Sequence, residues 1–259
     1  MDAILLGIVQ GFTEFLPVSS SGHLVIAQNL LGVSPGGGIV FEVALHLATL
    51  LAIMVFYRSR VGDLFVGVLS GRADAWRYTG KLLVATLPAV AVALLLREWI
   101  ESHFSSLPLV GGCLMITGCI VWTTRFTLSQ GGAEEPGWRA ALLIGTVQAI
   151  AILPGISRSG STVAAALALG MSPLAAAEFS FMLGMIAMAG AGVLLLPELS
   201  ASSGAALDAI LIGGVAALVS GLLALWAFVW LLRTQRFYLF AWYAWGVGAL
   251  TLTLALVGG

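Results

Sequence analysis

The chain has 259 residues, of which 60% are hydrophobic and 9% are charged. Soluble domains carry roughly 25% charged residues, because a globule needs a water-facing surface. This composition therefore excludes a soluble globular domain, and lipid is the predicted solvent. The formal net charge of −1 argues against a nucleic-acid partner, which would require a basic face.

Six apolar runs are long enough to cross a bilayer, for which roughly 20 residues are needed and about 17 suffice. They cover residues 39–57, 80–97, 107–126, 173–196, 209–232 and 238–257. Two further apolar segments, 2–32 and 138–170, are interrupted in the middle by proline, glycine and serine. Each half is too short to cross alone, and irregular backbone at membrane depth survives only against protein or a water-filled cavity. Both segments are therefore predicted to be re-entrant hairpins, made of a helix, a break and a second helix.

The two broken segments resemble each other. Gln10 to Gly22 and Gln148 to Gly160 are both steps of twelve residues, and each step contains Leu-Pro followed by serines. We interpret this pattern as an internal repeat of one hairpin and three spans.

An odd number of spans between the two copies inverts the second copy relative to the first, as in many transporters. The repeat halves are about 1–126 and 138–257, within a single membrane domain that covers 1–259. The predicted fold is thus an all-α integral membrane protein: six transmembrane helices plus two re-entrant helix hairpins in an inverted-topology repeat.

The distribution of Lys and Arg orients the predicted spans. If residues 1–38 lie outside, then Arg97 lies outside, Arg158 lies in the second break, and the other nine of the eleven cations lie in or beside inside connections. These nine are Arg58, Arg60, Arg72, Arg77, Lys81, Arg125, Arg139, Arg233 and Arg236. This excess of inside cations predicts that both termini are outside and that residues 58–79 form a cytoplasmic loop.

The first break carries polar side chains that are unusual in an apolar segment: Gln10, Glu14, Ser19, Ser20, Ser21 and His23. Gln10 and Glu14 are four residues apart and share one helical face, and His23 lies across the break from Glu14. A carboxylate at membrane depth is costly unless it is paired or solvated, so Glu14 is a functional candidate. The structural alternative is that Glu14 only caps or braces the hairpin.

The second break carries Ser157, Arg158, Ser159, Ser161 and Thr162. Arg158 is a cation far from any predicted loop, and the half-helix that follows directs free N–H groups at the cavity, which favours an anion. A guanidinium adds two parallel donors suited to phosphate. The structural alternative is an ion pair between Arg158 and a carboxylate such as Glu14 that only holds the hairpins together.

Together the two breaks offer donors for phosphate oxygens, a base and candidate nucleophiles, as phosphoryl transfer requires. Because the site is walled by lipid-facing helices, the predicted substrate carries a lipid tail. Elsewhere, His46 lies one turn after Glu42, and a hydrogen-bonded pair is the simpler explanation of that spacing.

Residues 10–23 and 154–162 resemble the undecaprenyl-diphosphate phosphatases of the bacitracin-resistance type. That family carries (Glu/Gln)-x-x-x-Glu running into Pro-x-Ser-Ser-(Ser/Thr)-Gly-His, and Pro-Gly-x-Ser-Arg-Ser further on. The resemblance implies that Glu14 is a general base or metal ligand, that His23 is catalytic, and that Ser20 is the nucleophile or a substrate contact. It also implies that Arg158 binds the diphosphate.

Further substrate-binding residues follow from the two breaks and the resemblance: Gln10, Ser19, Ser21, Ser157, Ser159 and Thr162. Many family members have Glu where this chain has Gln10, so this chain lacks the second carboxylate of such a metal site, and Glu14 is the metal ligand expected. The resemblance implies a divalent cation, Mg or Ca.

The activity that the resemblance implies is hydrolysis of undecaprenyl diphosphate to undecaprenyl phosphate and inorganic phosphate. This reaction recycles the lipid carrier of cell-wall synthesis at the outer side of the bacterial plasma membrane, and links the family to bacitracin resistance. The expected partners are the polyprenyl diphosphate and the bilayer, and the sequence leaves a homodimer open. The rivals are a transporter or flippase of a lipid phosphate, because broken helices and inverted repeats are typical of transporters, and an intramembrane serine protease.

The charge distribution makes a testable prediction of topology. A cysteine placed in 62–75 should be labelled only from the cytoplasmic side, and one placed in 200–205 only from outside. Labelling of intact cells with a membrane-impermeant maleimide distinguishes the two sides. The reverse pattern would contradict the predicted orientation.

Overall fold

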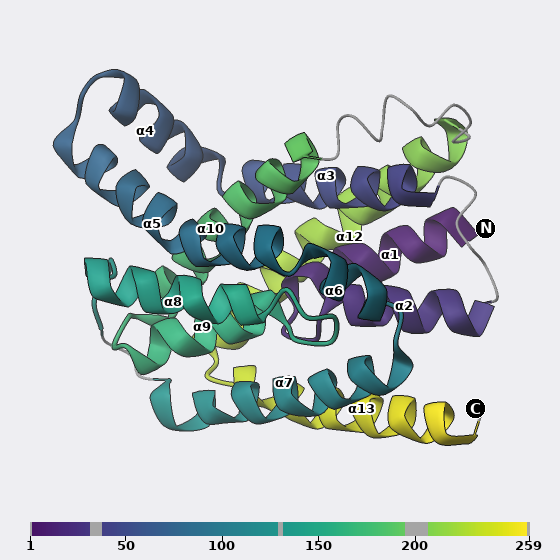
Figure 1. Cartoon of the computed structure of the whole chain (residues 1–259). Helices are drawn as coiled ribbons and strands as arrows, with labels where there is room; N and C mark the ends of the chain where they lie inside the picture. Colours follow the sequence, from purple (N-terminus) through teal and green to yellow (C-terminus); the bar gives the residue numbers. More distant parts are fainter. Residues whose placement is uncertain (1, 32–37, 129–131, 195–206, 258–259) are drawn as a thin grey trace.

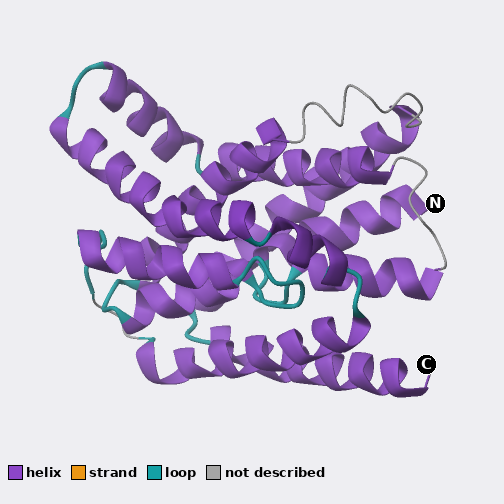
Figure 2. Ribbon diagram, in the orientation of Figure 1, coloured by secondary structure: helices purple, strands orange, loops and turns teal. Residues whose placement is uncertain are grey.

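The structure is a computed structural model of the chain that describes residues 2–31, 38–128, 132–194 and 207–257. Figure 2 shows that these residues form helices joined by short loops. The helices are α1 (Asp2–Phe15), α2 (Ser20–Leu31), α3 (Gly38–Phe56), α4 (Arg58–Leu69), α5 (Ala73–Leu95), α6 (Arg97–His103), α7 (Leu107–Thr127), α8 (Trp138–Ile150), α9 (Arg158–Ala168), α10 (Pro173–Leu194), α12 (Leu207–Arg233), the 3-10 turn η1 (Phe237–Leu239) and α13 (Phe240–Val257).

Five helical stretches of the described chain are long and apolar enough to cross a membrane: α5, α7, α10, α12, and η1 continued by α13. A sixth candidate is the pair α3 and α4, which bends by 83° at the junction. Five of the six predicted spans correspond to α5, α7, α10, α12 and α13, and the sixth falls on α3, which qualifies only together with α4. The all-α membrane fold is confirmed at the level of five to six candidate spans in the described chain.

The four helices beside the breaks are short. α1 and α2 have 14 and 12 residues, and α8 and α9 have 13 and 11. At 1.5 Å per residue each is roughly 16–21 Å long, which is less than the roughly 30 Å of a bilayer core. In Figure 1, α1 and α2 run from the side of both termini to the middle and back, whereas α8 and α9 start and finish on the opposite side.

Glycines allow each short helix to lie very close to a long one. A Cβ atom at Gly7 or Gly11 of α1 would overlap the backbone or side chain of α12, and one at Gly145 of α8 would overlap the backbone of α5. Small residues are common where membrane helices pack, because the helices must gain stability from close van der Waals contact rather than from burial of apolar surface. These contacts hold α1 against α12 and α8 against α5.

The core beneath the first break is aromatic. Phe15, the last residue of α1, meets Phe181 of α10 with ring centroids 5.7 Å apart, and Phe181 meets Phe228 of α12 at 4.9 Å. All three side chains are fully buried. The cluster fixes the last turn of α1, and this turn carries Glu14.

The prediction that residues 58–79 form a loop is wrong. They form α4 and the first turns of α5, a helical hairpin that projects at one side of the molecule (Figure 1). Gly71, two residues after the end of α4, has a φ of +74°, a conformation that glycine adopts without strain. Arg72 then donates two hydrogen bonds to Asp63, at 2.9 and 3.0 Å, and so joins the two helices. The prediction for residues 200–205 lies outside the described part of the chain.

Candidate active site

The two breaks contact each other in the middle of the structure. Ser19 has a φ of +68° and Gly155 a φ of +98°, so both chains turn sharply at these residues. The Ser19 hydroxyl accepts a hydrogen bond from the backbone N–H of Gly155, with 3.1 Å between the two atoms. A Cβ atom at Gly22 would lie 3.0 Å from Cα of Gly155. The two breaks are therefore in direct contact.

Hydroxyl groups hold the second break in shape. Thr117 of α7 donates to the carbonyl of Gly155 at 2.7 Å and accepts from the N–H of Ser157 at 3.0 Å. Ser157 caps α9, because its Oγ accepts from the N–H of Gly160 at 3.1 Å. Ser159 donates to the carbonyl of Leu16 in the first break at 3.3 Å. These bonds satisfy broken backbone that lipid could not hydrate.

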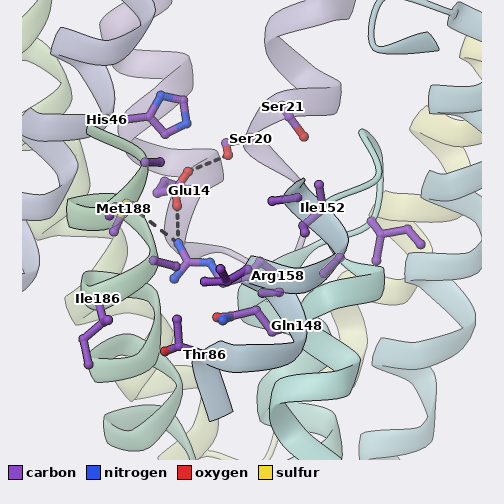
Figure 3. Close-up of a pocket in the computed structure, with 18 of the residues that line it drawn as sticks. Glu14, Ser20, Ser21, His46, Thr86, Gln148, Ile152, Arg158, Ile186 and Met188 are labelled. Atoms are coloured by element: carbon purple, nitrogen blue, oxygen red, sulfur yellow. Dashed lines mark hydrogen bonds and ion pairs between the residues drawn. The ribbon is translucent and has the colours of Figure 1, made fainter. Parts of the chain in front are cut away.

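Glu14 and Arg158 form a buried ion pair across the two breaks. Nη2 of Arg158 donates to Oε1 of Glu14, whose side chain is 6% exposed. The other carboxylate oxygen, Oε2, accepts from the Ser20 hydroxyl at 2.6 Å and from the Gln10 amide at 3.1 Å. Glu14 thus binds Arg158 of the second break and the hydroxyl of Ser20 in the first break. Figure 3 shows these groups converging.

A cavity of about 960 Å³ opens beside this ion pair. Its polar lining gathers around Arg158, and the remaining wall is mostly apolar and comes largely from α5 and α10 (Figure 3). The lining residues that carry polar groups are Thr13, Glu14, Ser19, Ser20, Ser21, His46, Thr86, Gln148, Ser157 and Arg158. Such a cavity can bind a ligand with a charged head and an apolar body.

A glycine makes room for the guanidinium. A Cβ atom at Gly184 of α10 would overlap Nη1 of Arg158. Nη1 is buried in this notch and has no hydrogen-bond partner among the described residues. The position of Arg158 is therefore set by the backbone of α10 as well as by Glu14.

The cavity includes most of the predicted site residues. Glu14, Ser19, Ser20, Ser21, Ser157 and Arg158 line it. Gln10 lies behind Glu14 and is fully buried, while Ser159 and Thr162 do not line the cavity and make hydrogen bonds within the fold. These last two residues support the second break in this structure.

His23 is not part of the cavity lining. Its Nδ1 lies 2.8 Å from the carbonyl oxygen of Ser19, and its Nε2 lies 2.9 Å from the hydroxyl of Tyr243 on α13. The two rings stack with centroids 5.6 Å apart. Its predicted catalytic role stays a prediction, and its contacts in this structure are with the backbone of the first break and with α13.

His46 and Gln148 are cavity residues to which we assigned no site role from the sequence. His46 hydrogen-bonds the backbone carbonyl of Glu42 at 2.9 Å through Nδ1, as the spacing predicted, yet its ring also faces the cavity near Glu14 (Figure 3). The sequence did contain a signal for His46, because an ionisable residue within a predicted span is a functional candidate. From the sequence, Gln148 was noted only as the first residue of the twelve-residue step that ends at Gly160.

The described residues contain no group of three or more His, Cys, Asp and Glu side chains placed to hold a metal ion. Glu14 is the one carboxylate in the described cavity lining. Beside it, Oε1 of Gln10 is buried and has no hydrogen-bond partner among the described residues. Among the described lining residues, a cation therefore finds a single carboxylate.

Comparison with known proteins shows matches over almost the whole chain. The family model described as bacitracin resistance protein BacA matches residues 3–250. A protein named undecaprenyl-diphosphatase from Desulforapulum autotrophicum is 39% identical, over an alignment that covers 99% of this chain and 98% of the relative. Proteins of the same name are 39% identical in Desulfosudis oleivorans, with 99% and 98% covered, and 36% identical in Syntrophotalea carbinolica, with 98% of each covered.

The glycine notch yields a prediction that the sequence did not contain. Gly184→Ala should displace the guanidinium of Arg158 and lower phosphate release from a polyprenyl diphosphate by about 10- to 100-fold, because small misplacements of catalytic groups cost that much. Gly192→Ala on the same helix is the control, since its Cβ would meet the protein only at 3.4 Å. Turnover and thermal stability of both purified variants provide the measurement. Normal turnover in Gly184→Ala would show that the notch does not position Arg158.

Proposed function

The chain belongs to the family described as bacitracin resistance protein BacA, and on this premise we propose that it is an undecaprenyl-diphosphatase. It hydrolyses undecaprenyl diphosphate to undecaprenyl phosphate and inorganic phosphate, and so returns the lipid carrier to cell-wall synthesis. The observation that carries this function is the joining of Ser20, Glu14 and Arg158 at the head of a largely apolar cavity. The curated relatives of that name match the chain over nearly its full length.

The cavity suits a lipid diphosphate. Small apolar residues of α5 and α10, among them Ala89, Val90 and Ala191, line much of the rest of the cavity. A prenyl chain can lie along such a wall and continue into the bilayer, while the diphosphate stays at the polar groups. Burial of the tail contributes binding energy roughly in proportion to the apolar area removed from water.

Ser20 and Glu14 have the geometry of a nucleophile and its base. The Ser20 hydroxyl already donates to Glu14 at 2.6 Å, within the distance that proton transfer requires. We assign attack on the terminal phosphorus to Ser20 Oγ, which passes its proton to Glu14. The Oγ–P bond forms, the bridging P–O bond breaks, and undecaprenyl phosphate leaves; water then releases phosphate from Ser20. A transporter has no need of such a pair.

Arg158 supplies the positive charge. Its Nη2 is held by Glu14 before substrate binds, so the guanidinium is already oriented when the diphosphate arrives. Preoriented donors in a site that excludes water stabilise developing charge better than mobile ones. In this proposal His23 helps to position Ser20, because it hydrogen-bonds the carbonyl of Ser19, the residue before Ser20.

A divalent cation, Mg²⁺ or Ca²⁺, is part of the proposal. Glu14 would hold it, and the unpaired Oε1 of Gln10 is a second oxygen of the type that these hard cations prefer. When bound it would neutralise phosphate charge. With so few protein oxygens, the diphosphate itself is expected to supply further ligands, as is common at Mg²⁺ sites.

The proposal includes the inverted-topology repeat and the two re-entrant hairpins in the bacterial plasma membrane. The arrangement of helices supports it: α1 packs on α12 of the other half, and α8 packs on α5 of the first half. The short helix pairs also approach the middle from opposite sides (Figure 1). In this arrangement the site opens to the outer side of the membrane, where carrier diphosphate is released. A homodimer is also proposed, but no contact among the described residues supports it.

One assay tests both the proposed hydrolysis and the assignment of Glu14 as the base. Purified wild-type protein in detergent should release phosphate from undecaprenyl diphosphate, and Glu14→Gln should lower this rate by about 100- to 10,000-fold, since the amide cannot accept a proton. Gln10→Glu should stay active, because it restores the carboxylate that many relatives have. Wild-type protein that releases no phosphate would overturn the proposed function, and near-normal turnover in Glu14→Gln would overturn the assignment of the base.

The role of Arg158 is tested by keeping its charge and removing its planar fork. Arg158→Lys should lose on the order of 2–4 kcal/mol of transition-state stabilisation, roughly 30- to 1000-fold in rate. Arg125→Lys, at an exposed position of α7, is the matched control and should turn over normally. Full activity in Arg158→Lys would mean that a point charge suffices at this position.

A further inference from the structure

The side chain of Gln148 in α8 is buried at the cavity without a hydrogen-bond partner. It is 3% exposed, and neither Oε1 nor Nε2 has a partner among the described residues. Gln148 lines the cavity, next to Arg158 and Thr86 in Figure 3. A buried amide that forms no hydrogen bond is costly, so this one is expected to bind something that enters the cavity.

The internal repeat explains why the amide is free. Gln10 and Gln148 occupy equivalent places, twelve residues before Gly22 and Gly160. Gln10 donates to Glu14, four residues later on the same helical face. The residue four positions after Gln148 is Ile152, which offers no acceptor. The hydroxyl of Thr86 donates to the carbonyl of Leu82 at 2.9 Å, and neither polar atom of Gln148 forms a hydrogen bond with it.

The surroundings favour a phosphate as the ligand. An amide presents both a donor and an acceptor, and a partly protonated phosphate presents both as well. Arg158 supplies positive charge nearby, and Glu14, the carboxylate of the cavity lining, is already held by Arg158 and Ser20. A neutral amide can therefore bind an anionic oxygen here without adding like-charge repulsion.

The side on which Gln148 lies indicates which phosphate it contacts. In the view of Figure 3 the Arg158 side chain lies between Glu14 and Gln148, and Ser20 is on the Glu14 side. In phosphoryl transfer the attacking and leaving oxygens are roughly in line, on opposite sides of the transferred phosphorus. With Ser20 as the attacking group, the leaving phosphate lies on the Gln148 side.

We propose that Gln148 binds the phosphate that remains on the lipid, with its Nε2 donating to that phosphate as it leaves. This inference rests on the proposed function and adds a specific role within it: Gln148 recognises the monophosphate end of the product. The terminal phosphate, which becomes inorganic phosphate, is held by Ser20 and Arg158 instead.

The test compares two inhibitors of phosphate release, farnesyl monophosphate and inorganic phosphate. In Gln148→Met, a variant of similar size without the amide, the inhibition constant for farnesyl monophosphate should rise at least about tenfold, as loss of a hydrogen bond to a charged group implies. The constant for inorganic phosphate should change less than about threefold. Gln28→Met, whose side chain bonds Glu42 away from the cavity, should leave both constants unchanged.

Gln148→Glu provides a second variant should the methionine variant fail to fold, because it keeps the shape and repels the lipid phosphate. It should weaken farnesyl monophosphate more than inorganic phosphate. A larger effect on inorganic phosphate, or no effect on either inhibitor in a folded and active variant, would overturn the role of Gln148. Wild-type protein that releases no phosphate would instead overturn the proposed function, so the two failures are distinguishable.

Discussion

The ion pair between Glu14 and Arg158 is the interaction on which the rest of the structure depends. Each residue alone would place an uncompensated charge at membrane depth, which is costly by any scale. Each lies beside a break whose backbone also lacks helical hydrogen bonds. Both problems have one solution, which is to bring the two breaks together so that the charges pair and hydroxyls satisfy the backbone.

This requirement explains the arrangement of the helices. The breaks can meet only if α1 and α8 lie close to long helices that carry them to the middle, and the glycines at their contacts with α12 and α5 permit this. The aromatic cluster around Phe181 fixes the end of α1. The notch at Gly184 does the same for the guanidinium, so that packing against lipid-facing helices controls the geometry of a charged site.

The same pair prepares the chemistry. A buried ion pair is weak evidence for stability, because desolvation offsets much of the attraction. In the proposed reaction its value is that Arg158 and Glu14 are oriented before substrate binds. The diphosphate can then replace Glu14 as the anionic partner of Arg158. In the same proposed reaction, the phosphate groups would meet donors already in place, and the apolar wall of the cavity would receive the prenyl chain. The structural alternative to a catalytic Arg158, an ion pair that joins the breaks, is therefore present in the fold and compatible with function.

The sequence by itself determined the apolar spans, the two breaks and the polar residues gathered at them, because run length, proline, glycine and intramembrane charge are local signals. It offered the ion pair between Glu14 and Arg158 only as an alternative to phosphate binding. The tertiary structure decided which side chains reach the cavity. His23 turned towards Tyr243, while His46 and Gln148 faced the cavity, and residues 58–79 became a helical hairpin. A helix in lipid can be apolar on every side, so its sequence carries little information about its rotation. That rotation is set by close contacts with other helices, which are distant in the chain.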